Sequence, residues 1–339
     1  MESFSVIRFR RLKEIVLYPY AKVVAPLLIV LIVLPQFIPV IYIFQLDAII
    51  IAVLFAVSLN LLMGYGGMIS FGHAAYYSLA AYTTALLFNH HFVSFPLAFA
   101  AGPALAALGA AVLGVFVVRT GGHYFLMLTL AFSQLIFAVI YQWYELTKGD
   151  DGIAGLFVQG LLGKPINYYY FSLIVVVISL TLIYGVLHSA FGYTLQAIRD
   201  NPARVEALGV RVNRYKLLAF VIAGYFAGVA GSLFAFFNGQ VSPEVAYWTQ
   251  SAEPFMSVII GGINSFFGPV LGAALYQVIG TQLSRVTQHS LLITGVVTLA
   301  VGLFFPRGIV GSIAELHIFE RGERRSDDNT TADTGISEG

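Results

Sequence analysis

The chain has 339 residues, of which 58% are hydrophobic and only 10% are charged, and its formal net charge is +1 at pH 7. Soluble domains carry about 25% charged residues, so this composition predicts a multi-span, all-α membrane protein. The small net charge argues against a nucleic-acid partner. The absence of cysteine excludes disulfides, zinc–thiolate sites and cysteine nucleophiles.

Long apolar runs separated by charged residues mark the predicted spans, since a helix needs about 20 apolar residues to cross the hydrocarbon and a central charge is costly. We expect about ten spans, or about eight if two less apolar segments are re-entrant. The clear runs are Val24–Phe44, Ala48–Met63, Ser94–Val118, Tyr124–Tyr144, Tyr169–His188, Leu217–Phe237 and Leu291–Phe305; the less apolar pair is Phe71–Phe88 and Gly268–Leu283; and Pro254–Ile260 is interpreted as half of a broken span.

The distribution of Lys and Arg predicts the orientation. Residues 1–22 and the loop Arg199–Lys216 each hold five Lys or Arg residues, whereas the loop Asn238–Glu253 holds two acids and no base. The positive-inside rule then places both termini and the basic loop in the cytoplasm, and the acidic loops outside. We therefore divide the chain into a cytoplasmic segment 1–22, a transmembrane domain 23–320 with a cytoplasmic loop at 190–216, and a polar tail 321–339 that is expected to be disordered.

A glycine-rich patch interrupts the early apolar region, where "GYGGMISFGHAAYY" runs from Gly64 to Tyr77. Glycine frees the backbone from helical geometry, and such backbone is tolerated at membrane depth only when it is buried in protein or lines a watery cavity. A later stretch, "GGINSFFG", repeats the pattern and suggests two related halves with interrupted helices near a substrate path. The alternative is that the glycines permit close helix packing, with His73 bonded to a neighbouring carbonyl. The candidate path residues are Gly64, Gly66, Gly67, Ser70, Gly72, His73, Gly261, Gly262, Ser265 and Gly268.

The basic loop contains the signals of a short helix. Asn201 is a good N-cap, Pro202 fits the first turn and Gly209 fits the position after the helix end. These signals predict a two-turn helix from Pro202 to Leu208, with Val205 and Leu208 on one face because they are three residues apart. Such a helix is too short to be stable alone. It either docks against a soluble motor subunit or lies on the lipid headgroups as an ordinary connection.

Several acidic residues lie near the predicted span ends. Asp150, Asp151 and Glu244 occupy the two outer loops and are candidate contacts for an external binding protein, with a plain solvated turn as the alternative. A metal site is disfavoured because the acidic turn lacks EF-hand spacing. Asp47 is expected to cap the second span and Glu253 to begin a helix.

Five stretches of the chain resemble the permease subunits of ABC importers of the branched-chain amino-acid type. They are "NLLMGYGGMISFGHAAYYSLAAYTTALL", "GGHYFLMLTLAFSQLI", "LTKGDDGIAGL", "LQAIRDNPARVEALGVRVNRYKLLAFVIAGYFAGVAGSLFA" and "GGINSFFGPVLGAALY". The resemblance runs colinearly from Ala48 to Gly308, and "GGHYFLMLTLAF" with the long N-terminal segment favours the larger of the two paralogous permeases.

The resemblance implies a type II importer fold like that of the vitamin B12 permease. It implies a second, usually paralogous permease, two ATP-binding subunits that carry ATP and Mg, and an extracytoplasmic solute-binding protein, all at a bacterial or archaeal plasma membrane. It also implies an ATPase-coupling loop, although Glu206-Ala207-Leu208-Gly209 departs from the longer spacing of other importers. The expected loop residues are Arg199, Asp200, Asn201, Pro202, Val205, Glu206, Ala207, Leu208 and Gly209.

Together these features predict a non-catalytic permease subunit for branched-chain or related amino acids. No G-x-x-x-x-G-K-[ST] phosphate loop occurs in the chain, so ATP hydrolysis is expected on a partner and no cofactor on this chain. Two alternatives remain: a permease of the same class for urea, amides or other small solutes, and a stand-alone secondary transporter, which would need intramembrane acids. An intramembrane enzyme is disfavoured because Ser70 and His73 have no acid nearby in sequence.

Overall fold

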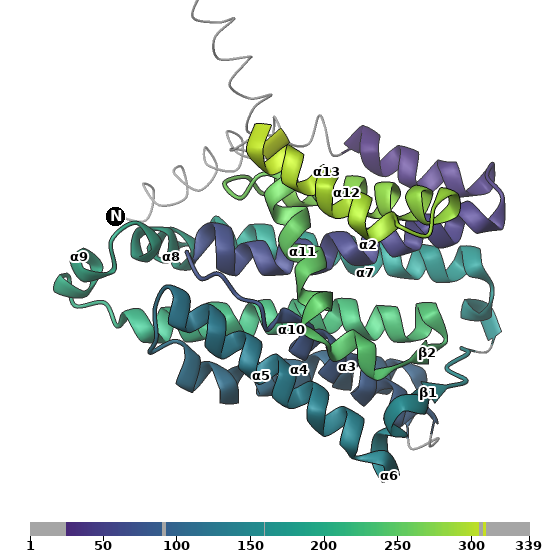
Figure 1. Ribbon diagram of the computed structural model, residues 1–339, viewed down its shortest axis with the longest axis horizontal. Coiled ribbons are helices and arrows are strands. Elements are labelled where there is room, and N and C mark those ends of the chain that lie inside the picture. The colour runs from purple at the N-terminus through teal and green to yellow at the C-terminus, as the bar shows by residue number, and fades with distance from the viewer. Residues whose placement is uncertain (1–24, 90–92, 159, 305–307, 310–339) are drawn as a thin grey trace, which may run out of the picture.

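The computed structural model describes residues 25–89, 93–158, 160–304 and 308–309. Over these residues the chain is a bundle of helices with one two-stranded sheet (Figure 1). The predicted N-terminal segment 1–22 and the predicted tail 321–339 lie outside the described residues, as does the end of the predicted transmembrane domain.

The helices follow the apolar runs. The first is Ala25–Gln36, whose last turn is η1 (Leu34–Gln36). The first half of the bundle then contains α2 (Val40–Asn60), η2 (Leu61–Tyr65), α3 (His73–Asn89), α4 (Phe95–Val117), α5 (His123–Gln142), α6 (Tyr144–Thr147), η3 (Gly149–Asp151), β1 (Ile153–Ala154) and η4 (Gly160–Gly163). The second half contains α7 (Pro165–Leu187), α8 (Ala190–Asp200), α9 (Pro202–Ala207), α10 (Val212–Asn238), β2 (Gln240–Val241), η5 (Pro243–Ala246), α11 (Trp248–Gly261), α12 (Gly268–Val286) and α13 (Ser290–Phe304).

Within the described part of the chain, five helices are long and apolar enough to cross a membrane. They are Val40–Tyr65, Phe95–Val117, His123–Gln142, Pro165–Leu187 and Val212–Asn238. The remaining candidate spans form helices that are shorter or less apolar, such as α3 with 17 residues and α11 with 14. The bundle is therefore polytopic, and the count of about ten crossings stays a prediction.

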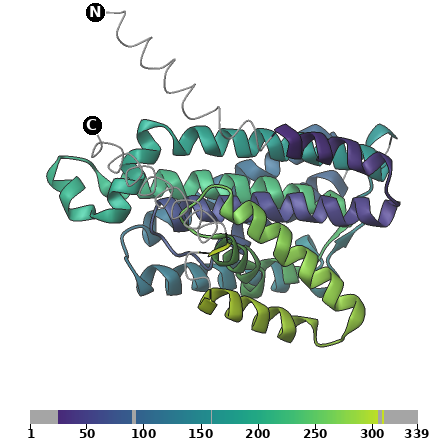
Figure 2. The ribbon, with the colours of Figure 1, turned by 90° about the horizontal axis from the view of Figure 1, so that it is seen from above.

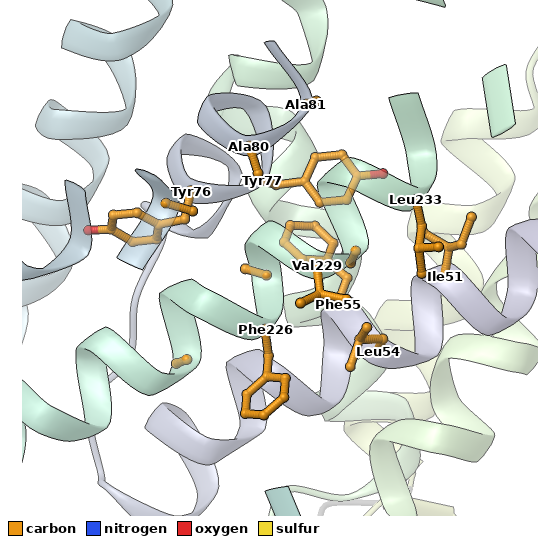
Figure 3. Packing of buried hydrophobic residues seen from close by; sticks show 14 of the residues in the cluster. Ile51, Leu54, Phe55, Tyr76, Tyr77, Ala80, Ala81, Phe226, Val229 and Leu233 are labelled. Atoms are coloured by element: carbon orange, nitrogen blue, oxygen red, sulfur yellow. The ribbon is translucent and has the colours of Figure 1, made fainter. Parts of the chain in front are cut away.

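Helix α10 forms the centre of the bundle and packs against α3 and α4. Small residues permit this close approach, since a Cβ atom at Gly231 would overlap the carbonyl oxygen of Tyr77 on α3. Figure 3 shows Tyr77 and Phe55 meeting at this core, and their ring centroids are 4.5 Å apart. The core is thus held by packing of aliphatic and aromatic side chains between helices that small residues bring together.

The boundary between the first two predicted spans is wrong. The sequence placed it at the charge of Asp47, but the first helix ends at Gln36 and α2 begins after Pro39. Proline has no backbone N–H to donate and disfavours helical geometry at the residue before it, so Pro39 separates the two helices. Asp47 therefore lies inside α2, 3% exposed, and does not cap it.

Two other helices begin before the predicted spans. α10 begins at Val212 rather than Leu217, and α11 extends from Trp248 across the predicted half-span Pro254–Ile260. Glu253 consequently lies within α11 and not at its start. Charged residues mark where a helix leaves the hydrocarbon of the membrane, and the predicted span limits were set by them. The helix itself can continue beyond that point, because its backbone hydrogen bonds also form in the polar boundary region.

The loops that carry charge gather at opposite ends of the bundle. Figures 1 and 2 show α9 projecting at one end, and Figure 1 places β1 and β2 at the other. The strands pair antiparallel, with Ile153 opposite Val241 and Ala154 opposite Gln240. This pairing joins the two acidic loops at the end away from α9.

Candidate coupling and translocation site

The short helix α9 forms where its local signals predict it. The side chain of Asn201 accepts a hydrogen bond of 2.9 Å from the backbone N–H of Arg204, which satisfies one of the unpaired donors of the first turn. At the other end, Gly209 has a φ of +83° and its N–H donates to the carbonyl of Glu206. The helix spans Pro202–Ala207, and Leu208 is the residue that ends it.

The two residues predicted to share a face, Val205 and Leu208, differ in burial. Val205 is 6% exposed and packs with Ile198 and Val212, whereas Leu208 is 79% exposed. The N–H of Leu208 still donates to the carbonyl of Val205, so the two residues are one turn apart, but it is Val205 that lies against α8 and α10. Val205 holds α9 onto its own chain, and the remaining coupling-loop candidates form an exposed surface: Arg199, Asp200, Asn201, Pro202, Glu206, Ala207, Leu208 and Gly209.

Arg199 connects this exposed surface to the first glycine-rich patch. Its Nη1 donates a 2.5 Å hydrogen bond to the carbonyl oxygen of Gly64, and its Nη2 forms a 3.1 Å ion pair with Asp200. A Cβ atom at Gly67 would lie 2.7 Å from Cγ of Arg199. The end of α8 therefore touches the interrupted helix through the Arg199 side chain, a contact that joins residues far apart in the sequence.

The first glycine-rich patch interrupts the long helix that α2 begins. After Asn60 the backbone widens into the π-helical turn η2, and the helix then stops, with Gly67 at a φ of +64°. Arg199 satisfies the carbonyl of Gly64 in the freed backbone, and Ser70 accepts a 3.3 Å hydrogen bond from the N–H of Gly72. π-helical turns of this kind occur frequently at functional sites.

His73 and Ser70 are fully buried in this structure, each with no exposed surface. Nε2 of His73 lies 2.9 Å from the hydroxyl of Ser58, and the imidazole stacks on Phe55 with ring centroids 5.5 Å apart. The histidine thus bonds a serine hydroxyl rather than a backbone carbonyl. It is positioned to hold α3 against α2, and its role as a path residue stays a prediction.

The second glycine-rich patch separates α11 from α12. Gly261 ends α11, Gly262 has a φ of +112°, and the N–H of Gly268 at the start of α12 donates to Oγ of Ser265 over 2.7 Å. A Cβ atom at Gly261 would overlap the backbone of Gly268. Glycine is required here because the ends of the two helices touch backbone to backbone.

The two glycine-rich patches contact each other. Nδ2 of Asn60 donates a 3.1 Å hydrogen bond to the carbonyl of Ser265, and a Cβ atom at Gly64 would overlap the carbonyl oxygen of Ile263. Sequence reasoning singled out both patches but missed Asn60. Its one sequence signal is a polar amide inside the apolar run "SLNLLMG". The structure thus places both helix interruptions and Arg199 in one connected cluster: Asn60, Gly64, Gly67, Arg199, Ile263 and Ser265.

The candidate contacts for a binding protein lie at the opposite end. Asp150, Asp151 and Glu244 are exposed, and the hydroxyl of Tyr144 donates a 2.8 Å hydrogen bond to Asp151. That hydrogen bond raises the pKa of the Tyr144 hydroxyl above its ordinary value. Pairing of β1 with β2 brings Glu244 to the same end as the two aspartates. No group of three or more metal-binding side chains occurs among the residues that the structure describes.

Comparisons with known proteins agree with this arrangement. Residues 41–305 match the family model described as "Branched-chain amino acid transport system / permease component". LivM of Escherichia coli, a high-affinity branched-chain amino acid transport system permease protein, is 28% identical over 77% of this chain and 68% of its own length. The corresponding proteins BraD of Pseudomonas aeruginosa and LivH of Salmonella typhimurium are 26% and 25% identical, each over 76% of this chain, and over 91% and 90% of their own lengths.

The family match covers most of the chain and includes both glycine-rich patches and α9. The relatives include LivM and LivH, two permease proteins of branched-chain amino acid transport systems. The chain belongs to the branched-chain amino acid transport permease family, and it is a multi-pass, non-catalytic permease subunit of an ABC importer.

Proposed function

We propose that this chain forms half of the translocation path of an ATP-driven importer for branched-chain or related amino acids, and that α9 couples the path to ATP hydrolysis on a partner. The observation that carries the proposal is the cluster at Arg199. This residue lies on the exposed surface around α9 and donates to Gly64 in the interrupted helix. Movement of α9 would therefore act directly on backbone that is free of helical constraint.

The second glycine-rich patch extends this mechanical connection. Because Asn60 and Gly64 contact the loop at Ile263–Ser265, a shift of the first interrupted helix displaces the second. Both interruptions contain glycines at positive φ, Gly67 and Gly262, that act as local hinges with little resistance from side chains. The path is proposed to open and close by relative movement of the helices at these two interruptions.

The proposed partners occupy the two ends of the bundle. A paralogous permease completes the path, and two ATP-binding subunits that carry ATP and Mg dock at the α9 end, which is cytoplasmic. A solute-binding protein docks at the end that holds Asp150, Asp151 and Glu244. The separation of these two surfaces supports this assignment, because an importer receives solute on one side of the membrane and force from the other.

Single-cysteine variants test the assignment cleanly, because the chain contains no cysteine. The matched pair is Leu208, which ends α9, and Leu161 in η4, which precedes α7; 79% and 81% of their surfaces are exposed. In inside-out vesicles, Leu208→Cys is expected to react with a membrane-impermeant maleimide and to crosslink to an ATP-binding subunit. Leu161→Cys is expected to react only in right-side-out cells. Labelling of Leu208→Cys from outside, or no crosslink in a transporting complex, would overturn the proposal.

Substituting Gly209 by valine is expected to reduce ATP-driven uptake several-fold without affecting membrane insertion. A Cβ atom at Gly209 meets no other atom within 4 Å, so the effect arises from the φ of +83° alone. A β-branched residue in this conformation costs roughly 1–2 kcal/mol, which is comparable to the stability of so short a helix. Uptake in proteoliposomes, normalised to the amount of inserted chain, provides the measurement; uptake equal to that of wild type would show that the end of α9 is not needed for coupling.

A further inference from the structure

A cavity of about 310 Å³ lies at the end of the bundle away from α9, between the first part of α2, the start of α7 and the end of α10. It is separate from the cluster at Arg199. Its volume is at the lower end of the range for small-molecule sites. The lining residues that the argument uses are Phe44, Asp47, Phe157, Tyr168, Phe237 and Asn238.

Asp47 is the acidic residue among the described residues of this lining, and none of them is Lys or Arg. The side chain is 3% exposed, and one of its carboxyl oxygens, Oδ1, has no hydrogen-bond partner among the described residues. The Ser172 hydroxyl on α7 is a neutral donor close to the carboxyl, and the hydroxyl of Tyr168 is committed to the carbonyl of Leu233 over 2.6 Å. Since buried carboxylates are normally paired or hydrogen-bonded, the site lacks a cationic partner.

The end of α10 adds negative potential to the same cavity. The last residues of this helix, from Phe236 to Asn238, line the wall together with Gly239, which ends the helix at a φ of +70°. The final carbonyls of a helix have no partner within the helix and carry the negative end of its dipole. A carboxylate and a helix C-terminus that face one cavity both favour a bound cation.

The remaining walls select the kind of cation. Phe44, Phe157, Phe237 and Tyr168 present aromatic rings, and the centroids of Phe44 and Phe237 are 6.1 Å apart. Hard metal ions require about six oxygen ligands, whereas aromatic walls with one carboxylate suit an organic ammonium group through cation–π contact and a charged hydrogen bond.

We propose that this cavity binds a primary ammonium group attached to a small apolar body, with Asp47 as the ionic partner and Phe44, Phe157 and Phe237 as the aromatic enclosure. The ammonium group has two possible sources: a free amine or amino acid on the end away from α9, or an ethanolamine lipid headgroup. Both present the same chemistry to Asp47, and they differ in whether the membrane itself supplies the ligand.

Isopentylammonium chloride is the probe, and neutral isopentanol is its matched control. The full chain in nanodiscs is titrated calorimetrically with each compound. Wild type is expected to bind the ammonium at least tenfold more tightly than the alcohol, and the isosteric variant Asp47→Asn is expected to lose this preference. Phe157→Leu should weaken ammonium binding several-fold. The Phe157 side chain is 73% exposed, so this substitution is expected to leave the fold intact. Asp200→Asn, an exposed acid near α9, should leave ammonium binding unchanged.

The outcomes separate the possibilities. Equal binding of the two probes by wild type, or an ammonium preference that persists in both Asp47→Asn and Phe157→Leu, overturns the proposal. Displacement of the probe by sodium chloride at equal concentration also overturns the proposal, because it would show that the cavity binds a metal cation. If phosphatidylethanolamine nanodiscs weaken probe binding relative to phosphatidylcholine nanodiscs, the lipid headgroup is the ligand; equal binding in the two supports a free amine.

Discussion

Substituting Arg199 by alanine is expected to lower ATP-driven solute uptake by at least tenfold while the chain still inserts and assembles. The substitution removes the 2.5 Å hydrogen bond to the carbonyl of Gly64 and the aliphatic contact with Gly67. A hydrogen bond to a charged group contributes about 1.5–3 kcal/mol, and loss of about 1.4 kcal/mol from the rate-limiting conformational step slows it about tenfold. Uptake and ATP hydrolysis, measured together in proteoliposomes with loaded binding protein, give the coupling ratio.

Two further variants make this result specific. Arg199→Lys keeps the charge but lacks the planar guanidinium that reaches Gly64, so partial activity is expected. Arg214→Ala removes an exposed arginine at the start of α10 and is expected to transport normally. Uptake by Arg199→Ala equal to that of wild type would show that force reaches the interrupted helices by another route.

Substituting Gly261 by valine is expected to destabilise the packing of α11 against α12. A Cβ atom there would overlap the carbonyl group of Gly268 and lie 3.0 Å from its Cα. Backbone cannot move aside as a flexible side chain does, so the helix ends must separate. Overpacking of this kind costs about 1–3 kcal/mol and occasionally more, which corresponds to a melting temperature several degrees lower. Thermal unfolding in detergent, followed by size-exclusion chromatography, measures the loss.

The matched control for this variant lies on the same helix as Gly268. Gly280 is in α12, and a Cβ atom there meets nothing within 4 Å. Gly280→Val should therefore melt close to the wild-type temperature. If Gly261→Val has the same melting temperature as Gly280→Val, the contact between the two helix ends contributes nothing to stability.

The limits of α9 could be predicted because the signals that set them are local. The N-cap hydrogen bond that Asn201 accepts, a proline in the first turn and a glycine beyond the end each act within four residues. The burial of its side chains could not be predicted in the same way. Val205 is buried by Ile198 and Val212, whereas Leu208 is exposed, because burial depends on neighbouring helices that a repeat count does not reveal.

Asp47 illustrates the opposite case. Read in isolation, an acid in an apolar run marks a helix boundary, because burying an unpaired charge is costly. In the bundle it lies within α2 beside a cavity at the ends of α7 and α10, helices that follow it by more than a hundred residues. The predicted position of Asp47 at a helix boundary is therefore wrong, because the cavity that it lines belongs to the assembled helices.

Composition, apolar run length and turn chemistry by themselves determined that this chain is a polytopic helical membrane protein with two glycine-rich interruptions and a short capped helix, because those properties depend on transfer from water and on hydrogen bonds between near neighbours. The tertiary structure alone decided that the two interruptions touch, that Arg199 joins α8 to the first of them, and that Asp47 faces a cavity. These contacts join segments up to about two hundred residues apart and depend on which helix faces pack together, information that no short stretch of sequence contains.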